Sequence, residues 1–350
     1  MTGIPMRFAV LGPDGVVGRR LVAELDARAL PWSPVPRNPP AGAAGAAEPG
    51  TVLLCAVGGD ADGVREQLGA AVDAGLDVVD VDREVGHLRW LHAELGPRAA
   101  ASGARVVGAA GLRWAVGDLL VALAAAQVAV PEAAHVAYTQ AGGRRRLTPG
   151  ERRAELAALG HPGMALVDSV EVEEPPGGDR RLAWFPRPVG PSHAAAVPGG
   201  EALTVPRHLP GVATVRSYEA LSGWRAELLQ AHGNLARGPR GQRLLRRRLH
   251  RTLRAAAEDP ASAERRWGVV AEVAGAERLG RAWAYGYDPV HTTAALAVAL
   301  GLALRYSSGG AAVPGALAPA EVAPAADLLD DVAERTGLRW SRTVTDRPPI

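Results

Sequence analysis

The sequence contains no lysine, a single cysteine and few aromatic residues, and each shortage excludes a class of function. All 39 basic residues are arginine, so a lysine that forms a Schiff base or acts as a nucleophile is excluded. Cys55, the only cysteine, cannot form an intramolecular disulfide, and its apolar setting indicates a buried small side chain. With aromatics at 4%, the cores must consist mainly of alanine, valine and leucine.

Charge and length set further limits. The 39 basic and 37 acidic residues nearly cancel, so no global field for nucleic acid is expected. The start of the chain lacks the pattern of a signal peptide, and no apolar run approaches the roughly 18 residues of a membrane span. We therefore expect a soluble, cytoplasmic protein. The single cysteine and the spacing of the nine histidines predict no metal site.

The segment from Arg7 to Leu25 predicts a strand, a glycine turn and a helix. Its first residues form a short apolar run suited to a buried strand, and helical spacing of apolar residues follows. Gly12 can form the sharp turn, Gly15 can admit a pyrophosphate close to the backbone, and Gly18 can let helix and strand pack closely. The spacing Gly-x-x-Gly-x-x-Gly is a weak signal alone, and a plain strand-to-helix turn is the alternative.

Strands and helices alternate through the first 110 or so residues, which predicts a doubly wound parallel sheet. Further strands are expected at 51–57, 77–82 and 104–108, with helices between them. Ligands bind beyond the carboxyl ends of such strands. The residues assigned on this basis to a dinucleotide site are Gly12, Asp14, Gly15, Val16, Val17, Gly18, Arg37, Ala56, Val57, Gly58, Asp80 and Gly111.

Arg37 decides which dinucleotide is expected. It stands about twenty residues beyond the glycine turn, where an acidic side chain would bind a ribose hydroxyl and an arginine a 2′-phosphate. The planar guanidinium suits phosphate, so NADP(H) is favoured over NAD(H), and a solvated loop arginine is the alternative. The prolines around Arg37 indicate that the second strand is very short or lies at an edge.

The second half of the chain has a different pattern. Alternating segments at 135–140, 168–173, 182–185, 200–206, 267–273 and 281–285 predict strands of a largely antiparallel sheet, with a loop at Pro191–His193. We expect an α/β protein with a dinucleotide-binding domain at 1–113 plus about 286–350. A substrate and dimerisation domain is expected at 114–285, with an α+β architecture. A homodimer is the expected assembly.

An arginine-rich insert is expected at about 225–265. Eight arginines recur between Arg237 and Arg254, with leucines between them at helical spacing. Such a helix could bind a membrane surface or nucleic acid. The favoured interpretation is a helical element whose leucines pack on the sheet while its arginines stay solvated, because aromatic residues are absent from the stretch.

The order of motifs resembles the saccharopine dehydrogenase-like oxidoreductases, including those described as trans-acting enoyl reductases. The matching segments are 12–18, 36–38, 55–59, 79–84, 111–118, 205–208 and 286–293. The resemblance spans nearly the whole chain and implies a Rossmann-type domain and NAD(P)-dependent hydride transfer. Three positions depart from the family pattern, because Gly59 replaces a proline, Arg83 a glycine and Arg113 an aspartate.

Two functional hypotheses follow. The first is an NADPH-dependent reductase that transfers a hydride to a C=N or polarised C=C bond of a small or carrier-bound metabolite. The second is a nonenzymatic protein that keeps the fold and nucleotide binding but has lost hydride transfer, as the three departures suggest. Hydride transfer needs a proton donor and a positioned substrate. The candidates are Tyr138, His193 in its loop, and Arg113 as a clamp on an anionic substrate.

Overall fold

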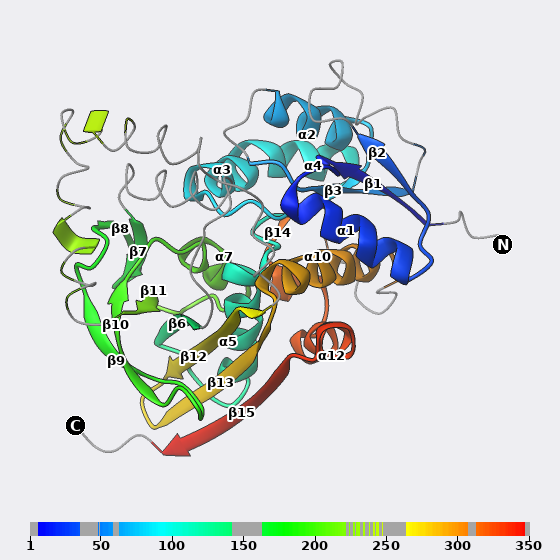
Figure 1. Ribbon diagram of the computed structural model, residues 1–350. Coiled ribbons are helices and arrows are strands. Elements are labelled where there is room, and N and C mark those ends of the chain that lie inside the picture. The colour runs from blue at the N-terminus through cyan, green and yellow to red at the C-terminus, as the bar shows by residue number, and fades with distance from the viewer. Residues whose placement is uncertain are drawn as a thin grey trace. The chain divides into compact units, whose positions relative to one another are not determined.

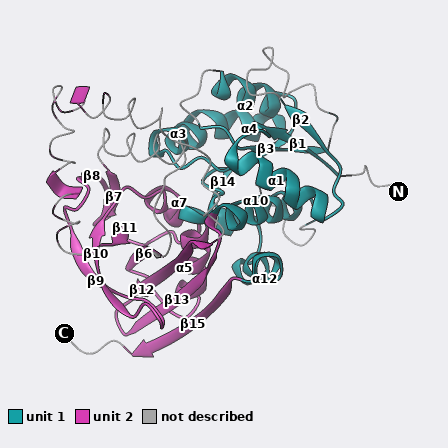
Figure 2. Ribbon diagram, in the orientation of Figure 1, with its two compact units in different colours: residues 1–115, 290–337 teal, residues 116–289, 338–350 magenta. Residues whose placement is uncertain are grey.

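The computed structural model describes residues 6–35, 48, 50–58, 63–141, 163–221, 264–306 and 313–346, together with isolated positions between 224 and 247 (Figure 1). The chain forms two compact units. The first comprises residues 1–115 and 290–337, and the second residues 116–289 and 338–350 (Figure 2).

The first unit begins with the predicted alternation of strands and helices. Its elements are β1 (Arg7–Leu11), α1 (Val16–Ala27), β2 (Trp32–Val35), β3 (Thr51–Cys55), α2 (Val64–Asp73), β4 (Asp77–Asp80), α3 (Val85–Trp90), a π-helical turn (Leu91–Leu95), α4 (Gly96–Ser102) and β5 (Arg105–Val107). After the second unit the chain returns with α10 (Pro289–Tyr306), β14 (Gly315–Leu317), α11 (Pro319–Val322) and α12 (Ala325–Thr336).

The six strands of this unit form one parallel sheet in the order β14-β5-β4-β3-β1-β2. Every residue of β3 and β4 is buried, as expected of strands covered on both faces. The chain runs outward from β1 to β2 and then crosses to β3, which creates a topological switch point at β1 and β3. The four-residue β2 contains Pro34 and lies at the edge, as predicted.

Helix α10 packs directly on one face of the sheet. A Cβ added to Gly301 would lie 2.8 Å from Phe8 and 3.4 Å from Val52, so the helix approaches the strands closely because it carries a glycine there. The middle of α10 is almost entirely buried, including Ala294–Val298. Its apolar body therefore belongs to the core of the sheet.

The second unit is an α+β structure. Its elements are α5 (Gly117–Ala125), β6 (Ala133–Ala141), β7 (Gly163–Val167), β8 (Val170–Glu174), β9 (Arg180–Trp184), β10 (Pro191–Ala196), α7 (Glu201–His208), β11 (Thr214–Ala220), β12 (Arg266–Ala274), β13 (Arg278–Tyr287) and β15 (Arg339–Asp346).

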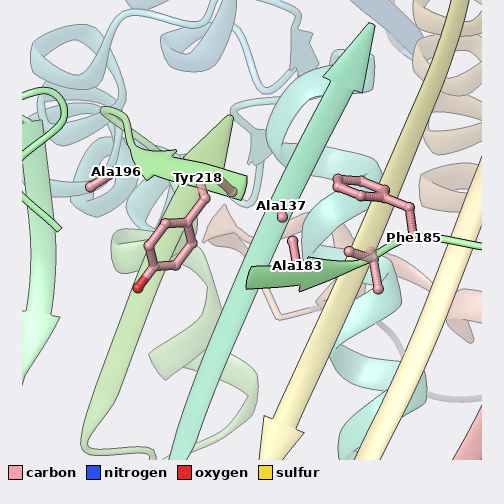
Figure 3. Packing of buried hydrophobic residues seen from close by; sticks show 7 residues of the cluster. Ala137, Ala183, Phe185, Ala196 and Tyr218 are labelled. Atoms are coloured by element: carbon pink, nitrogen blue, oxygen red, sulfur yellow. The ribbon is translucent and has the colours of Figure 1, made fainter. Parts of the chain in front are cut away.

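These strands form a mixed sheet in the order β15-β13-β12-β6-β11-β10-β9, with β7 joined to β11 and β8 to β7. Among the described strands of this second sheet, only β6 and β11 pair in parallel, and the remaining pairs are antiparallel. Ala183 and Phe185 pack with Ala137, Tyr218 and Val270 in a buried cluster, part of which Figure 3 shows. The two sheets confirm the predicted fold class.

Three expectations for local structure were wrong. Residues 201–208 form helix α7 where a strand was expected, because the segment packs Ala202 and Val205 inward on one helical face. Pro191–His193 begins strand β10 and is not a loop, because it pairs with β9. Residues 339–346 add a strand to the second sheet by pairing with β13, although 286–350 was assigned to the dinucleotide-binding domain.

Another expectation lies outside the described residues, because most of the arginine-rich stretch between Arg237 and Arg254 is not described.

Candidate functional site

The turn between β1 and α1 uses its three glycines for different purposes. Gly12 has a φ of +78°, and a Cβ there would lie 2.4 Å from a methyl group of Val57. A Cβ on Gly18 would lie 2.0 Å from the carbonyl oxygen of Gly12. The fold therefore requires glycine at both positions.

Gly15 differs because the fold does not require a glycine there. Its φ of −69° and ψ of 167° are open to any residue. A Cβ on Gly15 would make only an ordinary contact of 3.4 Å with the Gly12 carbonyl oxygen. In a dinucleotide-binding turn the middle glycine lets the ligand approach the backbone closely, and Gly15 holds the position of that middle glycine.

The first turn of α1 leaves main-chain donors open. The N–H groups of Val16, Val17 and Gly18 have no hydrogen-bond partner within the described part of the chain, and Gly15 provides no side-chain cap. No acidic residue occupies this turn, and the Asp14 carbonyl accepts a hydrogen bond from Arg19. Open donors and the positive end of the helix dipole suit a phosphate.

The end of β3 lies against this turn. Ala56 donates a main-chain hydrogen bond to the Leu11 carbonyl, and Val57 contacts Gly12. Gly58 follows as the last described residue of the loop. The Cys55 thiol is buried. Burial is the main cause that raises its pKa well above the usual range, and the nearby Asp80 carboxylate adds to it. Cys55 is therefore an unreactive packing residue, as predicted.

Asp80 ends β4, and its side chain is completely buried. One carboxylate oxygen accepts a hydrogen bond of 2.8 Å from the N–H of Asp82, and the other lies 2.7 Å from Nε2 of His87. Sequence reasoning placed Asp80 at the cofactor site but missed His87. The short pattern around His87 carries no motif, so only the fold reveals this pair.

Strained backbone marks the loop that follows β5. Ala109 has a φ of +58° and Trp114 a φ of +78°, which side chains with a Cβ rarely adopt. Such residues gather at functional sites because the surrounding structure must hold them in place. The loop follows β5 at the carboxyl edge of the parallel sheet and contains two predicted site residues, Gly111 and Arg113.

The candidate proton donors Tyr138 and His193 both belong to the second unit. Tyr138 lies on β6 with its side chain buried, and its hydroxyl donates a hydrogen bond to the carboxylate of Glu201 on α7. Ser217 donates a second hydrogen bond of 2.7 Å to the same carboxylate. His193 is exposed on β10. The structure therefore does not group these two candidates in one network.

Arg37 lies outside the described residues, as does Gly59. The part of the chain that is described contains no group of three or more histidine, cysteine, aspartate or glutamate residues that could hold a metal ion. Among the described helices none is long and apolar enough to cross a membrane.

Comparison with solved structures identifies the fold. The apo form of saccharopine dehydrogenase (L-Glu forming) from Saccharomyces cerevisiae superimposes with a TM-score of 0.58 at 12% sequence identity. The match covers 97% of this chain and 100% of that one. The chain has the saccharopine dehydrogenase fold. No protein-family model matches the sequence, and no curated protein matches it.

Other solved structures resemble the chain more loosely. GenD2 from gentamicin A biosynthesis, in complex with NAD, is 11% identical with a TM-score of 0.41, and the match covers 100% of this chain and 98% of that one. An inositol dehydrogenase homolog from Azotobacter vinelandii is 12% identical with a TM-score of 0.38, over 97% and 98% of the two chains. Of these three likenesses, only the one to saccharopine dehydrogenase supports the fold.

Within the saccharopine dehydrogenase fold, segments quoted for the sequence resemblance contact each other in pairs. His208 at the end of α7 lies 2.9 Å from the fully buried carboxylate of Asp118 on α5. The N–H of Leu112 donates a hydrogen bond of 3.1 Å to Oγ1 of Thr293 on α10. The motif series therefore marked positions that hold the fold together.

Proposed function

We propose that the protein is an NADPH-dependent reductase that transfers a hydride to a C=N or polarised C=C bond of a small or carrier-bound metabolite. The observation that carries the proposal is Gly15. It is the one glycine of the turn whose missing side chain the fold does not explain, and it stands beside the open N–H groups of Val16, Val17 and Gly18. A bound pyrophosphate accounts for both features.

The rest of the carboxyl edge fits this assignment. Strands β1, β3, β4 and β5 are parallel, so the loops that follow them all begin at the same edge of the sheet. In such folds dinucleotides bind at this edge, at the switch point. The strained loop after β5 carries Gly111 and Arg113. The fold also supports hydride transfer as the proposed reaction, since the solved structure that shares it is named as a dehydrogenase.

Each residue then has a defined task. The N–H groups of the turn would hold the pyrophosphate, and Arg37 would bind the 2′-phosphate of NADPH. When bound, the dinucleotide supplies the hydride. Tyr138 or His193 is the proposed donor of the one proton that the reduced bond takes up. Arg113 would hold an anionic group of the substrate.

Fluorescence titration with NADPH and NADH tests the proposal directly. We expect the protein to bind both dinucleotides, with NADPH bound about tenfold or more tightly, because a guanidinium and a phosphate form a strong charge-assisted pair. Arg37→Gln should remove this preference while NADH affinity stays unchanged. Failure to bind either dinucleotide would disprove the proposal.

Reduction itself needs a second experiment. NADPH oxidation is followed at neutral pH with three probe classes, which are cyclic imines, mixtures of an amine with a 2-oxo acid, and enoyl thioesters. We expect turnover with one class. Tight NADPH binding without oxidation by any of them would favour the nonenzymatic alternative, in which the changes at Gly59, Arg83 and Arg113 have removed hydride transfer.

A further inference from the structure

The structure contains a buried acid–base pair immediately beneath the candidate cofactor edge. We propose that His87 is a positioning residue of this site, which acts by holding Asp80 and through it the loops that follow β4 and β5. The proposal rests on the proposed function, because it concerns the affinity of the site for the dinucleotide.

Asp80 is placed to fix both loops. Its carboxylate accepts a hydrogen bond of 2.8 Å from the N–H of Asp82, which shapes the chain after β4. Its main-chain carbonyl accepts a hydrogen bond of 2.9 Å from Ala110, the residue before Gly111. The next residue, Val81, donates to the Cys55 carbonyl at the end of β3. A shift of Asp80 would therefore displace the loops that follow β3, β4 and β5 at the carboxyl edge.

The ring of His87 cannot turn away from Asp80. It is 1% exposed and stacks on Trp90 at 5.4 Å between ring centroids. The guanidinium of Arg65 lies over the same Trp90 ring at 5.0 Å. Glu84 accepts a hydrogen bond of 2.6 Å from the main-chain N–H of His87, which fixes the backbone as well.

The hydrogen bonding of the ring defines how it acts. Nε2 lies 2.7 Å from the Asp80 carboxylate, whereas Nδ1 has no hydrogen-bond partner among the described residues. Neutral His87 therefore donates through Nε2 and keeps an unprotonated Nδ1. Protonated His87 forms a neutral ion pair with Asp80 at the cost of one buried N–H without an acceptor.

Several charged groups face this imidazole. Burial alone lowers the pKa of His87, but the Asp80 carboxylate outweighs it and raises the pKa above the ordinary histidine value. Asp82 acts in the same direction as Asp80, and Arg65 opposes both. The Cys55 thiol also interacts with the Asp80 carboxylate, but its raised pKa keeps it uncharged.

The charge of the pair links His87 to the cofactor. Below the pKa of His87 the pair is neutral, and above it one negative charge remains at an edge that would hold a pyrophosphate. Like charges repel, so the affinity for the dinucleotide should fall as the pH rises through the pKa of His87. A residue that only fills the core would produce no such dependence.

NADH is the appropriate probe because it lacks the 2′-phosphate, whose own ionisation near pH 6 would complicate NADPH titrations. The dissociation constant of NADH is measured by fluorescence between pH 6 and 9 for the wild type, His87→Gln, His87→Phe and the double variant His87→Phe with Asp80→Asn. Thermal unfolding at each pH reports stability separately. Glutamine can present an amide N–H to Asp80 but does not titrate, so it is the matched control for phenylalanine.

We expect the wild type to bind NADH about three- to tenfold more weakly at the high end of the range. His87→Gln should bind NADH at every pH with the weaker constant that the wild type shows at high pH, because glutamine cannot neutralise the Asp80 carboxylate. His87→Phe should weaken binding about tenfold, because the buried Asp80 carboxylate then has no partner. The double variant His87→Phe with Asp80→Asn should bind no more weakly than His87→Phe alone, since both changes break the same contact.

Retention of the wild-type pH dependence in His87→Gln would overturn the proposal, even if His87→Phe fails to fold. A wild-type affinity in His87→Phe together with a lower melting temperature would also overturn it and leave His87 as a packing residue. Failure of the wild type to bind NADH or NADPH would instead disprove the proposed function, which separates the two tests.

Discussion

The main-chain N–H of Leu112 donates a hydrogen bond of 3.1 Å to the side chain of Thr293, although the two residues are 181 positions apart. Gly111 lies against the same threonine, because a Cβ there would be 3.5 Å from its methyl group. The start of α10 thus holds the strained loop after β5. A segment late in the chain therefore contacts the loop that carries two of the predicted site residues, Gly111 and Arg113.

Replacement of Thr293 tests this contact. Thr293→Val keeps the shape but leaves the Leu112 N–H without its acceptor, so we expect a loss of about 1–3 kcal/mol in the free energy of unfolding. Thr293→Ser keeps the hydroxyl and should lose less than half as much. Amide hydrogen exchange at Leu112 should accelerate in Thr293→Val and stay slow in Thr293→Ser. Equal exchange in both variants would show that the hydroxyl does not hold the loop.

Alanine at Gly18 and alanine at Gly15 should affect different properties of the protein, the first mainly its stability and the second mainly its affinity for NADH. Gly18→Ala places a Cβ against the Gly12 carbonyl oxygen, so we expect a loss of about 2–4 kcal/mol in stability by thermal unfolding. Gly15→Ala should cost no more than about 1 kcal/mol, the usual difference between glycine and alanine at an N-cap. It should nevertheless weaken NADH binding at least about tenfold. Unchanged NADH affinity in Gly15→Ala would contradict the role assigned to Gly15.

Much of the fold could be predicted from the sequence because its signals are local. The strand, turn and helix at Gly12–Gly18 and the buried apolar strand β3 follow directly from periodicity and glycine placement. Helix α7 could not be predicted, because Thr204 and Val205 favour a strand locally and Pro206 disfavours the interior of a helix. Only packing of the segment on α5 and β11 makes it helical. The strand at 339–346 depends in the same way on its pairing with β13.

The candidate site was predictable only in part, for a related reason. The edge of the sheet follows from the strand pattern, so Gly12, Asp80 and Gly111 could be placed there from the sequence. The contacts made by their side chains join residues that no local pattern connects. His87 at Asp80 and Glu201 at Tyr138 are examples, because each pair forms only when distinct elements pack together.

Tyr138 can be tested as a proton donor against its structural role. Tyr138→Phe removes one of two hydrogen bonds to the buried Glu201 carboxylate, and Ser217→Ala removes the other. Each should lower the free energy of unfolding by about 1–3 kcal/mol. If Tyr138 donates the proton, Tyr138→Phe should also lower NADPH oxidation about a hundredfold, whereas Ser217→Ala should retain most activity. Similar activities in the two variants would assign Tyr138 a structural role only.

A buried carboxylate in the first unit predicts how stability depends on acid pH. Glu24 accepts hydrogen bonds from Arg28 and Arg335 and lies 3.3 Å from His291, and Arg28 also pairs with Asp331 on α12. Burial alone raises the pKa of Glu24, but these hydrogen bonds outweigh it and lower the pKa from 4.5 to about 2. The network therefore fastens α10 and α12 to α1.

The direction of the shift fixes the pH range. A carboxyl group with a lowered pKa in the folded state stabilises the protein fully above its unfolded value of 4.5, and this stabilisation is lost as the pH falls to about 2. The shift corresponds to about 3 kcal/mol. Glu24→Gln should therefore lower the free energy of unfolding at pH 7 and flatten its decline below pH 5, as followed by urea titration. The exposed Glu66→Gln on α2 is the matched control and should leave the decline unchanged. An equally steep decline in Glu24→Gln would show that other carboxylates cause the acid sensitivity.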